Sequence, residues 1–271
     1  MAEDNKIIIP KLIQQLEPDD KNKWHPIWRP CRTSWLRHHP GQWRFTSWRD
    51  HTIEAYIFRY CPDWWDVWHN FPIEIVKLDI ARYIIMYEQG GIYADMDTYC
   101  YRNFYDELEH DTIYLAPGAN NRELVQNSLL ISSGRSMFWR EVIEECFRRI
   151  KDFNIEIHRN RSTDPDSDFQ VFVRRSAGCG LLSEMYEDLN SHYKIKILDK
   201  SKYQVQPEYY DPGVVTRHML TGRWGNETHD AVVATYRKKY PDMSVEEIFK
   251  KDYKEFRDID IDTLDWNKQN G

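Results

Sequence analysis

A chain of 271 residues with 41% hydrophobic and 30% charged residues suits a soluble globular protein built as one large domain. Its formal net charge of -7 gives no general attraction for nucleic acid or an anionic membrane, although a local cleft for a diphosphate stays compatible with it. The five cysteines show no CxxC pair or zinc spacing, the N-terminus has no signal-like apolar region, and no apolar stretch is long enough for a membrane span. We therefore expect a cytoplasmic protein with reduced thiols, no nucleic-acid partner and no membrane span.

The first third of the chain predicts two strands and two helices. The β-branched run 6–13 predicts a first strand that ends at Pro10 or lies at a sheet edge there, and residues 43–48 alternate as a second strand. Residues 52–60 predict a short helix stopped by Pro62. The clearest helix spans 73–88, and its apolar stripe ends at two glycines.

The rest of the chain alternates between strand and helix patterns. Short strands are predicted at 92–94, 112–116, 128–132 and 195–198, and helices at 136–150, at 181–189 and from Ser244, which forms a capping box with Glu247. The polar stretch 151–168 reads as an exposed segment. This alternation predicts an α/β domain with a mainly parallel central sheet.

The most informative feature is the pair Asp95 and Asp97, which follows a helix, a double-glycine turn and a short apolar strand. Open α/β sheets bind ligands at the carboxyl ends of their strands, and two carboxylates on one face are stable beside a cation. Mg²⁺ or Mn²⁺ binds one or two carboxylates and completes its shell with substrate phosphates and water. The alternative to a metal site is a turn at the end of the strand in which both carboxylates are solvated. Asp79 and Arg82 share one helical face before this turn, where a simple surface ion pair is the alternative.

The segment 78–97 resembles the signature of the DXD-containing sugar transferases, in particular glycosyltransferase family 32. The family includes yeast-type α-1,6-mannosyltransferases, inositolphosphoceramide mannosyltransferases and α-1,4-galactosyltransferases, and the glucosylating domains of large clostridial toxins resemble it more distantly. The signature consists of Asp79-x-x-Arg82, Tyr83, Gly90-Gly91-Ile92-Tyr93 and Asp95-x-Asp97. Weaker similarity extends the resemblance over about residues 7–224, through Pro10, Gln15, Trp48, Asp50, Asn127, Ser128, His218, Gly222 and Trp224.

The resemblance implies a GT-A fold, a Rossmann-like α/β sandwich, as a single domain over 1–271. It would comprise a donor nucleotide-binding half (1–100), an acceptor-side half (101–224) and a C-terminal helical extension (225–271), although the last part resembles nothing known. It implies that Asp97, Asp95 and His218 bind the metal, Mn²⁺ or Mg²⁺, and that Asp95, Asp97 and Asn127 act in catalysis. The residues implied in donor binding are Pro10, Gln15, Asp79, Arg82, Tyr83, Gly91, Asp95 and Trp224.

Two departures from the family pattern leave the nucleobase contacts and the acceptor side open. Gln14 stands where the family has a histidine, and the stretch 176–180 replaces its usual Thr-Gly-Pro. The segment 217–224 lacks a clear period, so we expect His218 on a loop that closes over the donor, with Trp224 packing it down. For His218 the alternative is an ordinary core or surface histidine, and for Asn127 a structural hydrogen bond.

The expected function is therefore a retaining, metal-dependent transfer of a hexose from a nucleotide sugar to a glycan or other hydroxyl acceptor. A UDP-sugar is slightly favoured over GDP-mannose. The alternatives are a non-catalytic nucleotide-sugar or glycan-binding protein on the same fold, a metal-dependent phosphoesterase or nuclease, and an interaction protein with an incidental acid pair. A phosphoesterase usually needs more acids or histidines nearby than this segment offers. The oligomeric state stays open.

Overall fold

The computed structural model describes residues 7–20, 24–25, 27–118, 122–151, 153–159, 161–162, 164, 166–204, 213–219 and 221. The predictions for Gly222 and Trp224, for the capping box at Ser244 and for the helical extension lie outside these residues. Within the described part of the chain, no helix combines the length and the apolar character needed to cross a membrane.

Six strands form the central sheet in the order β2-β1-β3-β6-β5-β7. β1 pairs in parallel with β2 and β3, and β5 pairs in parallel with β7, whereas β6 runs antiparallel to both of its neighbours. Within the described residues, all strands of this sheet except β6 therefore run in one direction, and the predicted mainly parallel central sheet is confirmed. The strands are β1 (Leu12–Glu17), β2 (Arg44–Arg49), β3 (Gly91–Ala94), β5 (Ile113–Pro117), β6 (Val125–Ser132) and β7 (Ile195–Ile197).

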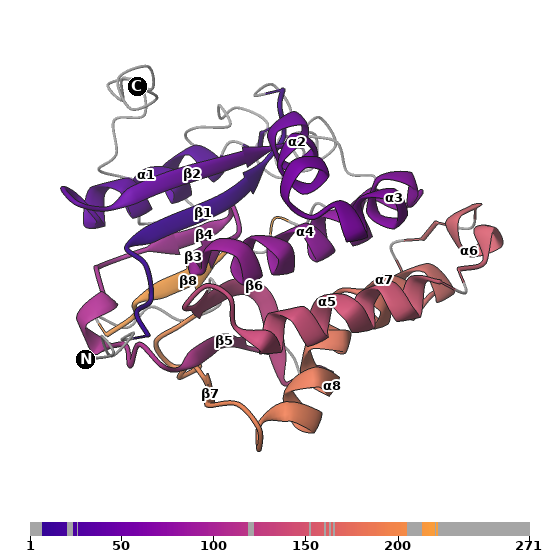
Figure 1. Cartoon of the computed structure of the whole chain (residues 1–271). Coiled ribbons are helices and arrows are strands. Elements are labelled where there is room, and N and C mark those ends of the chain that lie inside the picture. Colours follow the sequence, from indigo (N-terminus) through magenta and orange to yellow (C-terminus); the bar gives the residue numbers. More distant parts are fainter. Residues whose placement is uncertain are drawn as a thin grey trace.

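Helices cover both faces of this sheet, and most of them lie on one face (Figure 1). Along β3 and β6 the side chains alternate: Tyr93 and Leu130 pack against the larger helical layer, while Ile92 and Leu129 pack on the face that α1 covers. The helices are α1 (Trp28–His38), α2 (Asp50–Tyr60), α3 (Pro62–Asn70), α4 (Glu74–Gln89), α5 (Met137–Ile150), α6 (Ile155–Arg159), α7 (Asp168–Ser176) and α8 (Cys179–Leu189).

Several predicted boundaries were wrong, and each has a physical reason. The first strand begins at Leu12, beyond Pro10, because Leu12 donates its backbone N–H to the Pro10 carbonyl in a turn. Pro62 does not simply stop a helix; it is the first residue of α3, where a missing N–H costs nothing. The polar stretch 151–168 contains the short helix α6. Helices α1 and α7, rich in arginine, were not predicted.

A second sheet of two strands places the C-terminal end of the described chain next to the acid pair. β4 (Thr98–Cys100) follows the acid pair and pairs antiparallel with β8 (Thr216–His218). Thr98 lies opposite His218 in this ladder. The prediction of a loop at His218 was therefore wrong, because backbone pairing with β4 fixes this residue in a strand.

Candidate active site

A turn of two glycines with positive φ angles sets the position of the strand that leads to the acid pair. Gly90 and Gly91 have φ angles of 64° and 90°, and a Cβ on Gly91 would lie 2.5 Å from the Leu12 carbonyl oxygen. These glycines therefore let α4 end and β3 begin directly against β1. After β3, the Asp95 backbone N–H donates to the Ser128 carbonyl at 2.8 Å, which anchors the acidic turn to β6.

The acidic turn and β8 together form a cluster of two carboxylates and an imidazole. One possible ligand atom from each of Asp95, Asp97 and His218 lies within 4.8 Å of the others. His218 Nε2 is 3.2 Å from Asp97 Oδ1, and both side chains are largely buried. The structure thus brings together all three residues for which the sequence predicted metal binding, although their role stays a prediction.

Gln126 determines which nitrogen of His218 carries a proton. The Gln126 Nε2 donates to the Pro117 carbonyl oxygen at 2.9 Å, so its Oε1 is the atom that faces His218 Nδ1 at 3.2 Å. Because an amide oxygen only accepts, Nδ1 must carry the hydrogen. Neutral His218 would then direct the lone pair of Nε2 at the Asp97 carboxylate, and two acceptors repel each other. A proton or a metal cation between Nε2 and Oδ1 removes this conflict.

The pKa shifts of Asp95, Asp97 and His218 reflect the burial and the mutual contacts of these side chains. Burial opposes ionisation of Asp97, but the charge of His218 and hydrogen bonds from His218 and Thr221 outweigh it and lower the pKa of Asp97 to about 2. Burial also lowers the pKa of His218, yet the Asp97 carboxylate reverses this effect and raises that pKa overall. For Asp95, burial is the largest influence and raises its pKa despite the neighbouring Arg82. Of the two carboxylates, Asp97 is therefore the one that ionises more readily.

The second oxygen of Asp97 is held by Thr221, which lies three residues beyond the end of β8. Thr221 donates to Asp97 Oδ2 through its backbone N–H at 2.9 Å and through its hydroxyl at 3.0 Å. The Trp28 indole N–H in turn donates to the Thr221 hydroxyl at 2.9 Å, which connects this contact to α1. Oδ2 is thus occupied by protein donors, and Oδ1 is the oxygen that faces His218.

Arg82 on α4 connects the acidic turn to two further polar residues. Its Nη1 lies 3.0 Å from Asp95 Oδ1 and 2.9 Å from the Asn127 carbonyl oxygen, and its Nη2 lies 2.9 Å from Asp79 Oδ1. The Asn127 side-chain amide also donates to Asp79 Oδ1, at 3.0 Å. Burial is the main reason that the pKa of Asp79 is raised to about 7, against the lowering effect of Arg82. The ion pair between Asp79 and Arg82 is therefore buried, which contradicts the alternative of a simple surface ion pair.

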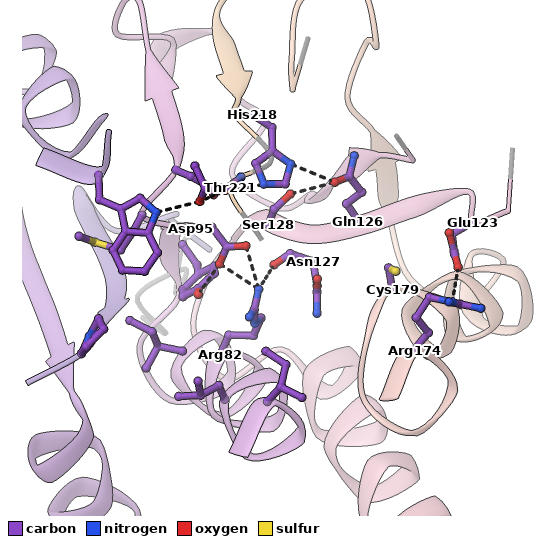
Figure 2. Close-up of a pocket in the computed structure, with 18 of the residues that line it drawn as sticks. Arg82, Asp95, Glu123, Gln126, Asn127, Ser128, Arg174, Cys179, His218 and Thr221 are labelled. Atoms are coloured by element: carbon purple, nitrogen blue, oxygen red, sulfur yellow. Dashed lines mark hydrogen bonds and ion pairs between the residues drawn. The ribbon is translucent and has the colours of Figure 1, made fainter. Parts of the chain in front are cut away.

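The acid pair, His218, Arg82 and Asn127 line a cavity of about 320 Å³ at the carboxyl ends of β1 and β3 (Figure 2). This volume lies within the usual range for small-molecule sites. Its lining includes Leu16, Pro18, Trp28, Ile75, Leu78, Arg82, Tyr93, Asp95, Met96, Asp97, Glu123, Gln126, Asn127, Ser128, Gln170, Arg174, Cys179, His218 and Thr221.

Apart from Trp224, which lies outside the described residues, the remaining residues predicted for donor binding do not line this cavity. Asp79 and Tyr83 are fully buried behind it, where the Tyr83 hydroxyl donates to the Ala177 carbonyl at 2.9 Å. Gln15 donates to the Asp95 carbonyl oxygen at 3.3 Å and Gly91 shapes the turn, so both support the acidic turn from outside the cavity. Pro10 precedes β1 at the end of the strand opposite to the cavity, so its position gives no support to a donor contact.

Gln14, the departure from the family pattern, has a structural place. Its Nε2 donates to the Gly90 carbonyl oxygen at 2.6 Å, and its Oε1 accepts from the Trp48 indole at 2.9 Å. It thereby connects β1, β2 and the glycine turn.

Sequence reasoning missed most of the cavity wall that lies beyond Asn127. Gln126 directly precedes Asn127, which was predicted as a site residue. The position of Gln126 in a strand of alternating side chains was the signal that could have identified it. Arg174 lies on α7, in a helix that was not predicted, and Thr221 was read only as part of a loop. Their contacts join segments far apart in the chain, which no local pattern reveals.

The family comparison matches the part of the chain that carries the acid pair. The model described as "Glycosyltransferase sugar-binding region containing DXD motif" matches residues 27–114. Inositol phosphoceramide mannosyltransferase 1 of Schizosaccharomyces pombe is 35% identical over 96 residues, which make up 34% of this chain and 29% of that protein. Mannosyl phosphorylinositol ceramide synthase CSH1 of Saccharomyces cerevisiae is 28% identical over 148 residues, or 55% of this chain and 38% of that protein. The chain thus spans less than two fifths of the length of these curated relatives.

Among solved structures, the chain is similar to a glycosyltransferase involved in the glycosylation of the major capsid of PBCV-1. The TM-score is 0.47 at 8% identity, and the match covers 78% of this chain and 95% of that chain. The glycosyltransferase GlyE of Streptococcus pneumoniae TIGR4 gives a TM-score of 0.45 at 12% identity, over 90% of this chain and 63% of that chain.

The matched segment contains the helix, the glycine turn and both acids of the predicted signature in the predicted order. The predicted resemblance to the DXD sugar transferases is therefore confirmed, and the prediction of a glycosyltransferase agrees with the names of the curated relatives. Residues 27–114 of this chain are thus similar to the glycosyltransferase sugar-binding regions that contain a DXD motif.

Proposed function

We propose that the protein is a retaining, metal-dependent glycosyltransferase that moves a hexose from a nucleoside-diphosphate sugar to a hydroxyl group of a glycan or other acceptor. One observation carries the proposal: His218 Nε2 faces Asp97 Oδ1 at 3.2 Å while Gln126 occupies Nδ1, so a cation completes this pair. The matched family and the names of the curated relatives support the class of reaction.

The donor atoms of the cluster fit a divalent cation. Carboxylate oxygens suit Mg²⁺ and Mn²⁺, and an imidazole nitrogen favours Mn²⁺ somewhat more. Asp97 is ionised over the whole physiological range because its pKa is held at about 2. Asp95, Asp97 and His218 would hold the ion, and three protein ligands leave positions for phosphate oxygens and water. The bound ion would offset the negative charge that builds up on the departing diphosphate.

The protein side chains around this site would orient the donor. Arg82 and Asn127 line the cavity next to Asp95, so they are placed to contact the sugar or the phosphates. Asp79 acts through them, because it holds Arg82 and Asn127 from behind with one carboxylate oxygen. These contacts preorganise the polar groups before the donor binds.

The proposed reaction exchanges one bond for another at the anomeric carbon. The bond from this carbon to the phosphate oxygen breaks, and a bond to the acceptor oxygen forms on the same face. The acceptor proton passes to an oxygen of the departing nucleoside diphosphate. The products are a glycoside and a nucleoside diphosphate, and no carboxylate nucleophile is assigned.

The identity of the donor stays a proposal. The sequence slightly favoured a UDP-sugar, whereas the curated relatives are named mannosyltransferases, which supports mannose as the first sugar to test. A panel containing UDP-glucose, UDP-galactose and GDP-mannose separates these possibilities.

Hydrolysis of this panel, with and without Mn²⁺, tests the proposed function. A transferase releases nucleoside diphosphate from one donor, with water as the acceptor, only when the metal is present. Binding of a nucleotide sugar without turnover under any metal condition would instead favour the non-catalytic binding protein.

A further inference from the structure

The cavity has a polar wall that the proposed donor site does not use. Glu123 and Arg174 form an ion pair there, with 3.1 Å between Arg174 Nε and Glu123 Oε1. Figure 2 shows this pair on the far side of Asn127 from Asp95, with Cys179 beside it. The side chains of Glu123 and Arg174 are only 12% and 19% exposed, and both line the cavity.

The order of the strands separates two ends of the cavity. Leu16, Pro18 and Trp28 line it on the side of β1 and α1. Glu123 precedes β6 and Arg174 lies on α7, and β6 is the neighbour of β3 on the side opposite to β1. The acidic turn after β3 lies between the two ends. If the nucleotide occupies the β1 end and the sugar attached to its diphosphate lies beside Arg82 and Asn127, the acceptor that attacks this sugar lies farther along the cavity, beside Glu123 and Arg174.

The local fold fixes Arg174 toward the cavity. Gln170 and Arg174 are one helical turn apart on α7 and both line the cavity, whereas Val173 is buried in the core. A Cβ on Gly178 would lie 3.0 Å from the Arg174 Cα, and one on Gly180 would lie 3.0 Å from the Arg174 carbonyl oxygen. Gly178 and Gly180 therefore allow α8 to begin directly against the last helical turn of α7.

Other contacts also connect the segments that carry this ion pair. On the outside, Arg122 Nη1 lies 2.8 Å from Asp166 Oδ1, which joins the segment before β6 to the segment before α7. The Val125 backbone N–H also donates to the Ser183 hydroxyl at 3.2 Å, which ties β6 to α8. Glu123 and Arg174 line the cavity, whereas the exposed Arg122–Asp166 pair does not, so the latter provides a control of the same charge types outside the cavity.

We propose that Glu123 and Arg174 form the acceptor subsite and select a neutral, hydroxyl-rich ring over a phosphorylated one. A sugar hydroxyl both donates and accepts, so adjacent hydroxyls can donate to the Glu123 carboxylate and accept from the Arg174 guanidinium. An anionic group gains little here, because Glu123 already neutralises Arg174 and would repel a second anion. This inference rests on the proposed function for its catalytic meaning.

The test compares Glu123→Gln and Arg174→Lys with the control variants Arg122→Gln and Asp166→Asn. NMR measures binding of methyl α-mannopyranoside and of mannose 6-phosphate in the presence of Mg²⁺, and a product assay with GDP-mannose and UDP-glucose measures the ratio of transfer to hydrolysis. We expect the wild type to prefer the neutral probe. Either cavity variant should weaken its binding about 10-fold, the loss expected for a charge-assisted hydrogen bond, and lower the ratio of transfer to hydrolysis. The controls should change neither quantity.

Unchanged binding of methyl α-mannopyranoside in both cavity variants, or a preference of the wild type for mannose 6-phosphate, would overturn the subsite. Equal losses in the control variants would also overturn it, because they would indicate a structural role. A third outcome separates the two proposals. If the wild type hydrolyses neither donor, but the cavity variants alone bind methyl α-mannopyranoside more weakly than the wild type, the subsite stands and the proposed transferase function fails.

Discussion

His218 Nε2 and Asp97 Oδ1 lie 3.2 Å apart, and the other contacts of both side chains dictate what can stand between them. Gln126 Oε1 accepts a hydrogen bond from His218 Nδ1, and Thr221 donates two hydrogen bonds to Asp97 Oδ2. Neutral His218 would therefore present a lone pair to a carboxylate oxygen. A metal ion resolves this arrangement, and a proton stands in for it when no metal is bound.

Replacing Gln126 by leucine should weaken metal binding without removing a ligand. The change frees His218 to rotate and to shift its hydrogen to Nε2, so we expect Mn²⁺ affinity to fall by about 10-fold. Calorimetric titration measures this loss. The double variant Gln126→Leu/His218→Ala should bind Mn²⁺ no more weakly than His218→Ala alone, because Gln126 acts only through the imidazole. Additive losses would show that Gln126 contributes independently.

Gly91→Ala should destabilise the protein and displace the acidic turn. The new Cβ would meet the Leu12 carbonyl oxygen at 2.5 Å, and the backbone at φ 90° is strained for alanine. We expect a loss of about 2–4 kcal/mol in the free energy of unfolding, since strain and overpacking add. Gly41→Ala is the control, because Gly41 has φ 76° but nothing within 4 Å, so only the strain of about 1 kcal/mol remains. Urea denaturation of both variants measures the difference, and equal losses would rule out the steric account.

Asp79→Asn should change how stability depends on pH. Burial raises the pKa of Asp79 to about 7 from an ordinary value of 3.8, so between these values the native protein binds this proton more tightly than the unfolded chain. The contribution of Asp79 to the free energy of unfolding therefore falls as pH rises through this window. The wild type should lose stability relative to Asp79→Asn between about pH 5 and 7, by at most about 1.4 kcal/mol per pH unit. Denaturation of both proteins at the two pH values is the measurement. A constant or growing advantage of the wild type would mean that Arg82 keeps Asp79 charged.

The part of the site that lies close together in the chain could be predicted, because helix periodicity and glycine punctuation are local. The helix, the glycine turn and the strand before Asp95 follow the sequence closely, with α4 at Glu74–Gln89 and β3 at Gly91–Ala94. His218 was reached only through family resemblance, and its strand was missed because β8 has just three residues. Glu123 and Arg174 could not be foreseen, since their meeting depends on how α7 packs against β6.

The central claim is that Asp97 holds a divalent cation needed for turnover. The most direct measurement is donor hydrolysis by protein treated with a chelator, before and after Mn²⁺ is restored, in the wild type and in Asp97→Asn. An amide keeps the shape of the side chain but lacks the charge of a carboxylate whose pKa is held at about 2. The account predicts no turnover in the chelated wild type, recovery with Mn²⁺, and a loss of at least about 100-fold in folded Asp97→Asn that Mn²⁺ does not restore. Full activity after chelation, or near-normal activity of Asp97→Asn, would contradict it.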